Sequence, residues 1–169
     1  MLKKSLEKFD INVFNDLEKS WAVVTAGTKE TKPNPMTVSW GGFGRIWNQD
    51  VCFIFIRKSR YTHEILDKCD SLSISFLDDK YLSDKVLFGK KSGKDLNKFE
   101  ESNLHPGFDP DLNTYIISEA RRVLKCKKIY EIDLDSNKMK DYIKDEFYKD
   151  GDIHTMYICQ IKEYLDNEE

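Results

Sequence analysis

The apolar residues of this 169-residue chain fall into short runs with the rhythm of β-strands, and this feature constrains the fold most strongly. The clearest run is Val51–Ile56 (VCFIFI), whose β-branched and aromatic residues are typical of a strand covered on both faces. Ser71–Phe76 instead alternates between polar and apolar residues, as a half-buried strand does. The sequence predicts further strands at Trp21–Thr25, Met36–Trp40 and Thr155–Ile161.

The order of strands and helices predicts a mainly β, α+β domain. One or two more strands are expected at Arg122–Cys126 and Ile129–Asp133, and the turn Asn48–Asp50 predicts a hairpin between Met36–Trp40 and Val51–Ile56. Helical spacing occurs at Tyr61–Asp67, Asp79–Phe88, Leu96–Glu101 and Lys138–Phe147. Many short strands with short helices between them favour an antiparallel barrel over a doubly wound parallel sheet.

Composition excludes several classes of protein. A net charge of -3 argues against a general nucleic-acid binder, and no run approaches the roughly 20 apolar residues of a membrane helix. The opening MLKKSLEKFD has no apolar core of a signal peptide. The four cysteines are scattered, which indicates free thiols in a reducing cytoplasm and neither a zinc cluster nor a disulfide scaffold. We therefore expect a single cytoplasmic domain over residues 1–169, with Cys126 and Cys159 as buried, inert thiols.

The segment Arg57–Glu64 (RKSRYTHE) is the first candidate for ligand binding. It lies where a predicted buried strand gives way to a helix, and the free N–H groups of a helix start favour an anion. Arg60 can add a bidentate contact to a phosphate. A solvated basic turn that carries a helix cap is an equally good interpretation of the spacing alone.

Two further segments have the composition of ligand-binding loops. Gly89–Lys94 (GKKSGK) resembles a phosphate cradle, although it lacks the spacing of a Walker A loop and also fits a flexible turn. Thr37–Gly42 (TVSWGG) ends a strand with small residues, so a flat ligand can approach the backbone closely; an ordinary strand end is the alternative. His154 precedes the last strand and is compatible with a capping role. His63 and His105 form no metal-binding pattern.

Taken in order, these segments resemble the flavin reductase-like family, the FMN-binding split-barrel group that includes flavoredoxins and small NAD(P)H:flavin oxidoreductases. The resemblance extends roughly from Trp21 to Ile161 and is carried by MTVSWGG, RKSRYTHE, KSGKDxxKF and HTMYI. It implies a six-stranded antiparallel split β-barrel with flanking short helices. It also implies a homodimer with one non-covalent FMN per subunit near the dimer interface.

The resemblance assigns each segment a role. The isoalloxazine ring would be lined by Thr37, Val38, Ser39 and Trp40. The ribityl phosphate would be held by Ser59, Arg60 and Thr62 with Arg57, and Tyr61 belongs to the same cofactor-binding set. The basic loop would close over the flavin through Lys91, Ser92, Gly93 and Lys94. His154 is the candidate catalytic residue, in a positioning role, because hydride transfer depends on geometry more than on an acid or base.

Several functional interpretations remain open within the family. Many reductases of two-component systems carry a glycine-acidic pair after the histidine, where this chain has Cys159 and Gln160, which argues against a reductase of that kind. The Trp40–Gly42 and KSGKD segments look closer to the flavoredoxin-type branch. The first interpretation is an enzyme that moves electrons from NAD(P)H through FMN to a small acceptor. The second is an electron carrier that exchanges electrons with partner proteins and binds no nicotinamide. The third is a protein that uses the flavin structurally or as a sensor.

Overall fold

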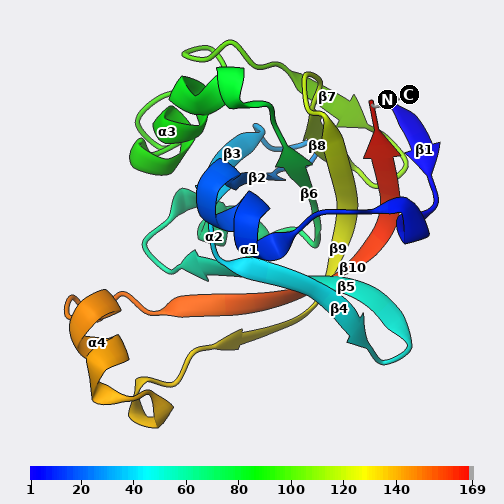
Figure 1. The fold of residues 1–169 in the computed structure, drawn as a ribbon. Helices are drawn as coiled ribbons and strands as arrows, with labels where there is room; N and C mark the ends of the chain where they lie inside the picture. Colours follow the sequence, from blue (N-terminus) through cyan, green and yellow to red (C-terminus); the bar gives the residue numbers. More distant parts are fainter. Residues whose placement is uncertain (168–169) are drawn as a thin grey trace.

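The strands form one antiparallel sheet that curls towards a barrel without closing (Figure 1). The computed structural model describes residues 1–167. The strand order is β3-β2-β6-β9-β10-β5-β4, and β1 pairs with the end of β10. The strands are β1 (Leu2–Lys4), β2 (Ala22–Ala26), β3 (Asn34–Val38), β4 (Gly41–Ile46), β5 (Gln49–Arg57), β6 (Ser71–Phe76), β9 (Arg122–Asp133) and β10 (His154–Asp166). This architecture confirms the predicted fold class, although the sheet has eight strands where six were expected.

The two ends of the sheet meet at a split. β3 and β4 are the terminal strands, yet only Ser39 and Trp40 separate them in the sequence. The two strands therefore lie next to each other without pairing. This split positions the site described below.

The predicted hairpin between Met36–Trp40 and Val51–Ile56 is wrong. β5 pairs with β4, and β3 pairs with β2, with Met36 opposite Val24. The sequence of β4 (GGFGRI) contains three glycines and lacks an alternating apolar pattern, so no strand was expected there. A further hairpin of β7 (Pro106–Asp109) and β8 (Thr114–Ile117) was also not predicted.

Two hydrophobic clusters cover opposite faces of the sheet. The larger fills the barrel interior with residues such as Val24, Ile54 and Leu124, and the smaller lies outside the barrel and includes Phe88 and Val123. Because β6 lies between them, Ser71–Phe76 is buried on both faces, not half-buried as predicted. The reverse holds for Val51–Ile56, where Phe53 and Phe55 on the outer face remain partly exposed. That strand is not covered on both faces.

Within residues 1–167, four α-helices flank the sheet: α1 (Val13–Asn15), α2 (Tyr61–Leu66), α3 (Leu82–Lys90) and α4 (Asp141–Phe147). The last three confirm helical segments predicted from the sequence, and α4 stands away from the barrel on the arm formed by β9 and β10 (Figure 1). The predicted helix at Leu96–Glu101 is wrong, because these residues form turns. Lys98 explains the difference, since its side chain is buried and bonds the main chain of two other segments.

The close approach of β4 to β5 gives a stability prediction. A Cβ added to Gly41 would lie 2.5 Å from the main-chain oxygen of Phe53, whereas one added to Gly42 meets only a Phe53 ring atom at 4.0 Å. We expect Gly41→Ala to lower the free energy of unfolding by about 1–3 kcal/mol, and Gly42→Ala by less than about 0.5 kcal/mol. Urea unfolding of both variants measures the difference, and equal midpoints would contradict the register of this strand pair.

Candidate functional site

Two connected cavities lie beside the split. The larger, of about 320 Å³, is named here the basic cavity, and the smaller, of about 250 Å³, the aromatic cavity. Met36, Arg57 and Arg60 line both, so the cavities form one continuous cleft. The basic cavity is also lined by Asn34, Ser59, Tyr61, Thr62, Lys90, Lys91, Ser92, Gly93, Lys98, Asp150 and Asp152. The aromatic cavity is also lined by Thr37, Val38, Ser39, Trp40, Phe55, Phe147 and His154.

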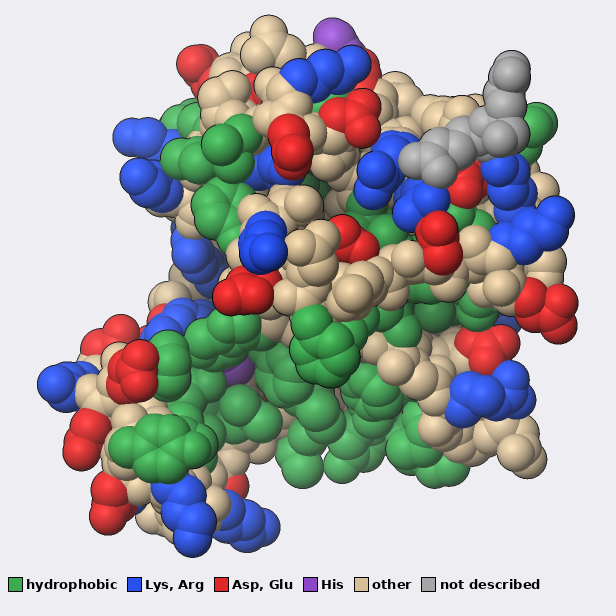
Figure 2. Space-filling view, viewed as in Figure 1, with side chains coloured by type: hydrophobic (Ala, Val, Ile, Leu, Met, Phe, Trp, Pro, Cys, Tyr) green, Lys and Arg blue, Asp and Glu red, His purple; other side chains and the backbone are tan. Residues whose placement is uncertain are grey.

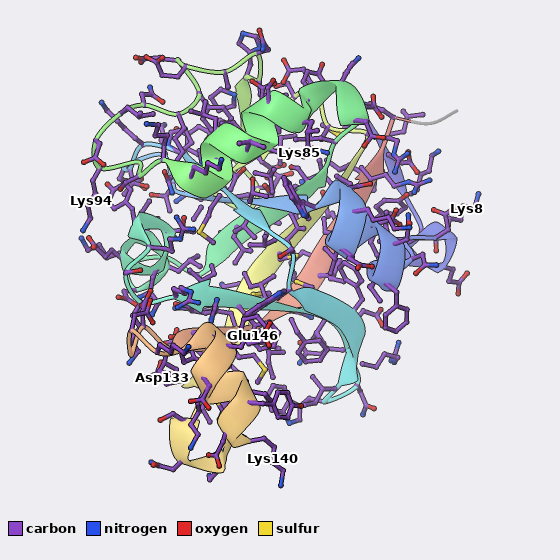
Figure 3. All side chains as sticks on the ribbon, turned by 60° about the vertical axis from the view of Figure 1, so that its left-hand side comes forward. Lys8, Lys85, Lys94, Asp133, Lys140 and Glu146 are labelled. Atoms are coloured by element: carbon purple, nitrogen blue, oxygen red, sulfur yellow. The ribbon has the colours of Figure 1, made fainter. Side chains whose placement is uncertain are left out.

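One wall of the cleft is the unpaired edge of β3. Pro35 has no N–H, and its carbonyl points away from β2 and accepts a hydrogen bond from Lys98 Nζ at 2.9 Å outside the sheet. Alternate residues of an antiparallel strand direct their main-chain groups to the same side, so Thr37 also turns its N–H and C=O to the open edge. The Thr37 hydroxyl donates to the Lys85 carbonyl at 2.5 Å and so fixes the strand against α3, the helix that carries Lys85 (Figure 3).

Positive charge dominates the basic cavity. Five cationic side chains and two carboxylates line it. Arg60 is half-buried, and no carboxylate within residues 1–167 pairs with it. Thr62 is buried, and its oxygen accepts from Asn34 Nδ2 at 2.8 Å, which leaves the hydroxyl proton to donate. Because α2 is only six residues long, these side chains, and not a helix dipole, make the cavity suited to an anion.

Lys98 is a site residue that sequence reasoning missed. It belongs to the KSGKDxxKF segment, but nothing in the spacing indicates that its side chain turns inward. The side chain is 4% exposed, and Nζ donates to the carbonyls of Pro35 at 2.9 Å and Phe88 at 2.8 Å. Burial, with a smaller contribution from Arg60, lowers the pKa of Lys98 to about 8. The ammonium group thus lines the basic cavity with no acidic partner among the residues that the structure describes.

Arg57 and Ser59 are already engaged within the protein. Arg57 donates to the carbonyls of Asp152 and Phe147, both at 2.8 Å, and thereby fixes the end of α4 against β5. Ser59 donates to the Asp152 carboxylate from its N–H at 3.1 Å and from its hydroxyl at 2.6 Å. Asp152 therefore occupies both donors of Ser59, a residue that the sequence resemblance assigned to the phosphate.

The loop after α3 forms the far wall of the basic cavity. Gly93 lies against β3 and α2, where a Cβ would stand 1.9 Å from Asn34 Oδ1 and 2.9 Å from a Tyr61 ring atom. Only glycine fits this position without movement of its neighbours. Lys91 and Ser92 line the cavity with Gly93, but Lys94 lies outside it at the outer edge of the loop (Figure 3) and forms an ion pair with Glu64.

Aromatic rings surround the second cavity. The Trp40 ring lies 5.3 Å from the Phe147 ring at an interplanar angle of 86°, and 4.9 Å from the His154 ring. His154 is 8% exposed, and burial, followed by the charge of Arg57, lowers its pKa to about 4. The imidazole is therefore neutral at pH 7, and it can donate or accept a hydrogen bond but cannot act as a cationic acid.

An apolar sheet face continues from the aromatic cavity. Phe53, Ile158 and Tyr130 lie side by side across β5, β10 and β9, and Phe55, Met156 and Ile132 form the next row. These six residues are named here the apolar face. Tyr130 and Ile132 are 43% and 46% exposed. Figure 2 shows hydrophobic side chains gathered on this lower part of the molecule, next to α4.

The described residues, 1–167, hold neither a metal-binding cluster nor a helix that could span a membrane. No group of histidine, cysteine and acidic residues there is arranged to hold a metal ion. No helix in the same range is long and apolar enough to span a membrane. All four cysteines are free, and Cys52, Cys126 and Cys159 are buried in the barrel interior, away from the cleft.

Comparison with solved structures shows the same fold in several flavoproteins. Flavoredoxin of Desulfovibrio vulgaris (Miyazaki F) has a TM-score of 0.70 and 20% identity, over 88% of this chain and 69% of that chain. An FMN-binding protein from Thermus thermophilus, solved with bound 1-cyclohex-2-enone, has a TM-score of 0.68 and 17% identity, over 87% and 70%. An NADH:FAD oxidoreductase of Streptomyces globisporus has a TM-score of 0.66 and 16% identity, over 87% and 75%.

Sequence comparison identifies the family. Comparison with curated proteins finds no match. The family model described as "Flavin reductase like domain" matches residues 14–169, which is most of the chain, and this match confirms the resemblance seen in the sequence motifs. The chain therefore belongs to the flavin reductase like domain family, a family of flavin-binding redox proteins.

Proposed function

We propose that the cleft binds FMN and that the protein moves electrons from NAD(P)H through FMN to a small acceptor. The observation that carries the proposal is the continuity of the cleft, in which Arg60 joins an anion-binding cavity to a cavity walled by aromatic rings. FMN has the same two ends, a phosphate and a flat ring. A cytoplasmic location is part of the proposal, because the free thiols remain reduced there.

The residues of the basic cavity fit the phosphate end. Arg60, Lys98 and the Thr62 hydroxyl supply donors that no carboxylate within residues 1–167 occupies. Lys91, Ser92 and Gly93 would complete the cradle from the loop after α3. Ser59 would contribute only if Asp152 moves, because the carboxylate holds both of its donors. Lys94 pairs with Glu64 and is left out of the proposed phosphate site.

The edge of β3 fits the ring end. The outward main-chain groups near Thr37 and Ser39 would bind the polar edge of the ring, and Trp40 with Phe55 would cover its apolar part. When bound, the flavin supplies the acceptor for two electrons from a hydride donor. His154, neutral at pH 7, would orient the flavin ring and the hydride donor and would exclude water from this wall of the cleft.

A flavoredoxin-like electron carrier that exchanges electrons with partner proteins, without nicotinamide, is the second candidate. The exposure of the aromatic wall favours it, since Trp40 and Phe147 are 39% and 36% exposed and border the apolar face. A protein partner seated there would come close to the ring. The two candidates share the flavin site and differ in the electron donor.

A visible spectrum and anaerobic addition of NADH or NADPH separate these candidates. The purified protein, loaded with FMN, should show the two flavin absorption bands, and bleaching by a nicotinamide would support the enzyme. Bands that persist with nicotinamide but bleach with dithionite would favour the carrier. A protein that takes up no FMN would contradict both candidates.

We also propose that the protein is a homodimer and that a second copy covers the apolar face. Two adjacent rows of hydrophobic side chains on three strands form a self-complementary surface of the kind that cyclic dimers bury. Phe55 belongs both to this face and to the aromatic cavity, so the second copy would close the open side of the ring site. The dimer would thereby shield the bound ring from water.

Arg60 should distinguish FMN from riboflavin, which has no phosphate. We expect Arg60→Gln to weaken FMN binding about tenfold to hundredfold, the range of charged hydrogen bonds, and to leave riboflavin binding nearly unchanged. Lys58→Gln is the matched control, because Lys58 is exposed, pairs with Asp133 and does not line the cleft. Fluorescence titration measures the dissociation constants. An unchanged ratio of FMN to riboflavin affinity in Arg60→Gln would contradict the placement of the phosphate.

The charge of Lys98 predicts a pH dependence of FMN binding. With a pKa of about 8, Lys98 is charged below that pH and neutral above it, while the phosphate, with a second pKa of about 6, stays dianionic. FMN affinity should therefore fall about tenfold as the pH rises from about 7 to about 9, and riboflavin affinity should stay nearly constant. Titrations at several pH values test this, and parallel profiles for the two ligands would argue against Lys98 as a phosphate ligand.

The oligomeric state tests the role of the apolar face. Light scattering should find a dimer for the wild type and a monomer for Tyr130→Asp combined with Ile132→Asp, because two buried carboxylates would destabilise the interface. Leu2→Asp, on β1 at the other end of β10, should remain a dimer although Leu2 is 68% exposed. A wild-type monomer that still binds FMN would refute the interface.

A further inference from the structure

Tyr148 and His154 form a buried pair at the wall of the aromatic cavity. Tyr148 follows α4 and His154 begins β10, and each side chain is 8% exposed. Tyr148 Oη lies 2.9 Å from His154 Nδ1, and the two rings meet edge to face with centroids 5.6 Å apart. His154 lines the cavity, while Tyr148 lies behind it and does not.

The protonation states of Tyr148 and His154 determine which side chain donates the hydrogen bond between them. Burial raises the pKa of Tyr148 and, together with Arg57, holds that of His154 near 4, so a protonated phenol faces a neutral imidazole at pH 7. If Nδ1 carried the proton, the phenol O–H would be buried with no acceptor among residues 1–167. If Tyr148 donates to Nδ1, that proton is satisfied and the imidazole proton must lie on Nε2.

We propose that Tyr148 is a positioning residue that holds His154 as the Nε2–H tautomer and so supplies the aromatic cavity with a fixed hydrogen-bond donor. The neighbouring groups restrain the pair on several sides. The Trp40 ring lies 4.9 Å from the His154 ring, and the Arg57 guanidinium lies 5.5 Å from the centroid of the Tyr148 ring. Arg57 also bonds the carbonyl of Phe147, the residue before Tyr148, which fixes the main chain at this point.

The consequence for redox chemistry rests on the proposed flavin function. Two-electron reduction adds negative charge to the ring, and a donor with a fixed direction stabilises that charge without reorganisation. Nε2 has no hydrogen-bond partner in the protein within the described residues, so it is available to a bound ligand. Tyr148 therefore acts through His154, and it stabilises the bound reduced ligand more than the bound oxidised ligand.

Tyr148→Phe tests the tautomer directly. Phenylalanine keeps the ring against His154 and Arg57 and removes only the hydroxyl. Tyr142→Phe is the matched control, because Tyr142 lies on α4 and is 68% exposed. Nitrogen-15 NMR of labelled histidine, with the His154 signals identified through His154→Asn, should show a single Nε2–H tautomer in the wild type and in Tyr142→Phe. In Tyr148→Phe the Nδ1 and Nε2 shifts should converge, as expected for a mixture of tautomers.

Redox titration of the FMN-loaded variants tests the consequence. Tyr148→Phe should lower the affinity for reduced FMN relative to oxidised FMN about tenfold, the factor of one ordinary hydrogen bond, and Tyr142→Phe should not. Unchanged His154 shifts in Tyr148→Phe would overturn the positioning role, whether or not FMN binds. A changed tautomer with an unchanged affinity ratio would overturn the donor role. Failure of the wild type to bind FMN would overturn the proposed function and leave the tautomer measurement to stand.

Discussion

The unpaired edge of β3 is the constraint on which the site depends. Ser39 and Trp40 are too short a connection to carry β4 far from β3, yet the two strands do not pair. Main-chain groups on that edge need partners from outside the sheet. Lys98 supplies one for Pro35, and the Thr37 side chain holds the strand against α3. The remaining groups face a cleft, where the proposed flat ligand with a polar edge would complete the hydrogen bonding of the sheet.

The charged residues around the basic cavity are also arranged in a way that suits a bound ligand. Acidic residues around the basic cavity are directed to particular partners: Asp152 to Ser59, and Glu64 to Lys94 outside it. Among the described residues no carboxylate pairs with Arg60 or Lys98, and the burial of Lys98 lowers its pKa. An anion placed between these two groups would offset the cost of that burial. Binding energy would thus come from positive charges that the folded chain holds in place but leaves unpaired.

The sequence predicted much of the fold because most strands carry an apolar pattern. It failed where the pattern is absent or ambiguous. β4 is rich in glycine, and the continuous apolar run of β5 does not show that Phe53 and Phe55 remain partly exposed. Most residues of the three candidate segments line one cleft, because each segment follows or ends a strand or helix that borders the split. The motifs could not reveal long-range contacts, such as the bonds of Lys98 to two distant carbonyls or the occupation of Ser59 by Asp152.

The central claim is that FMN lies along the β3 edge, with its phosphate between Arg60 and the loop after α3. Backbone amide NMR of the labelled protein during titration with FMN tests it most directly. The account predicts that the largest shift changes occur at Thr37–Trp40 and Ser92–Gly93, with smaller changes on β1 and on the β7–β8 hairpin. Changes centred elsewhere, or none at saturating FMN, would contradict it.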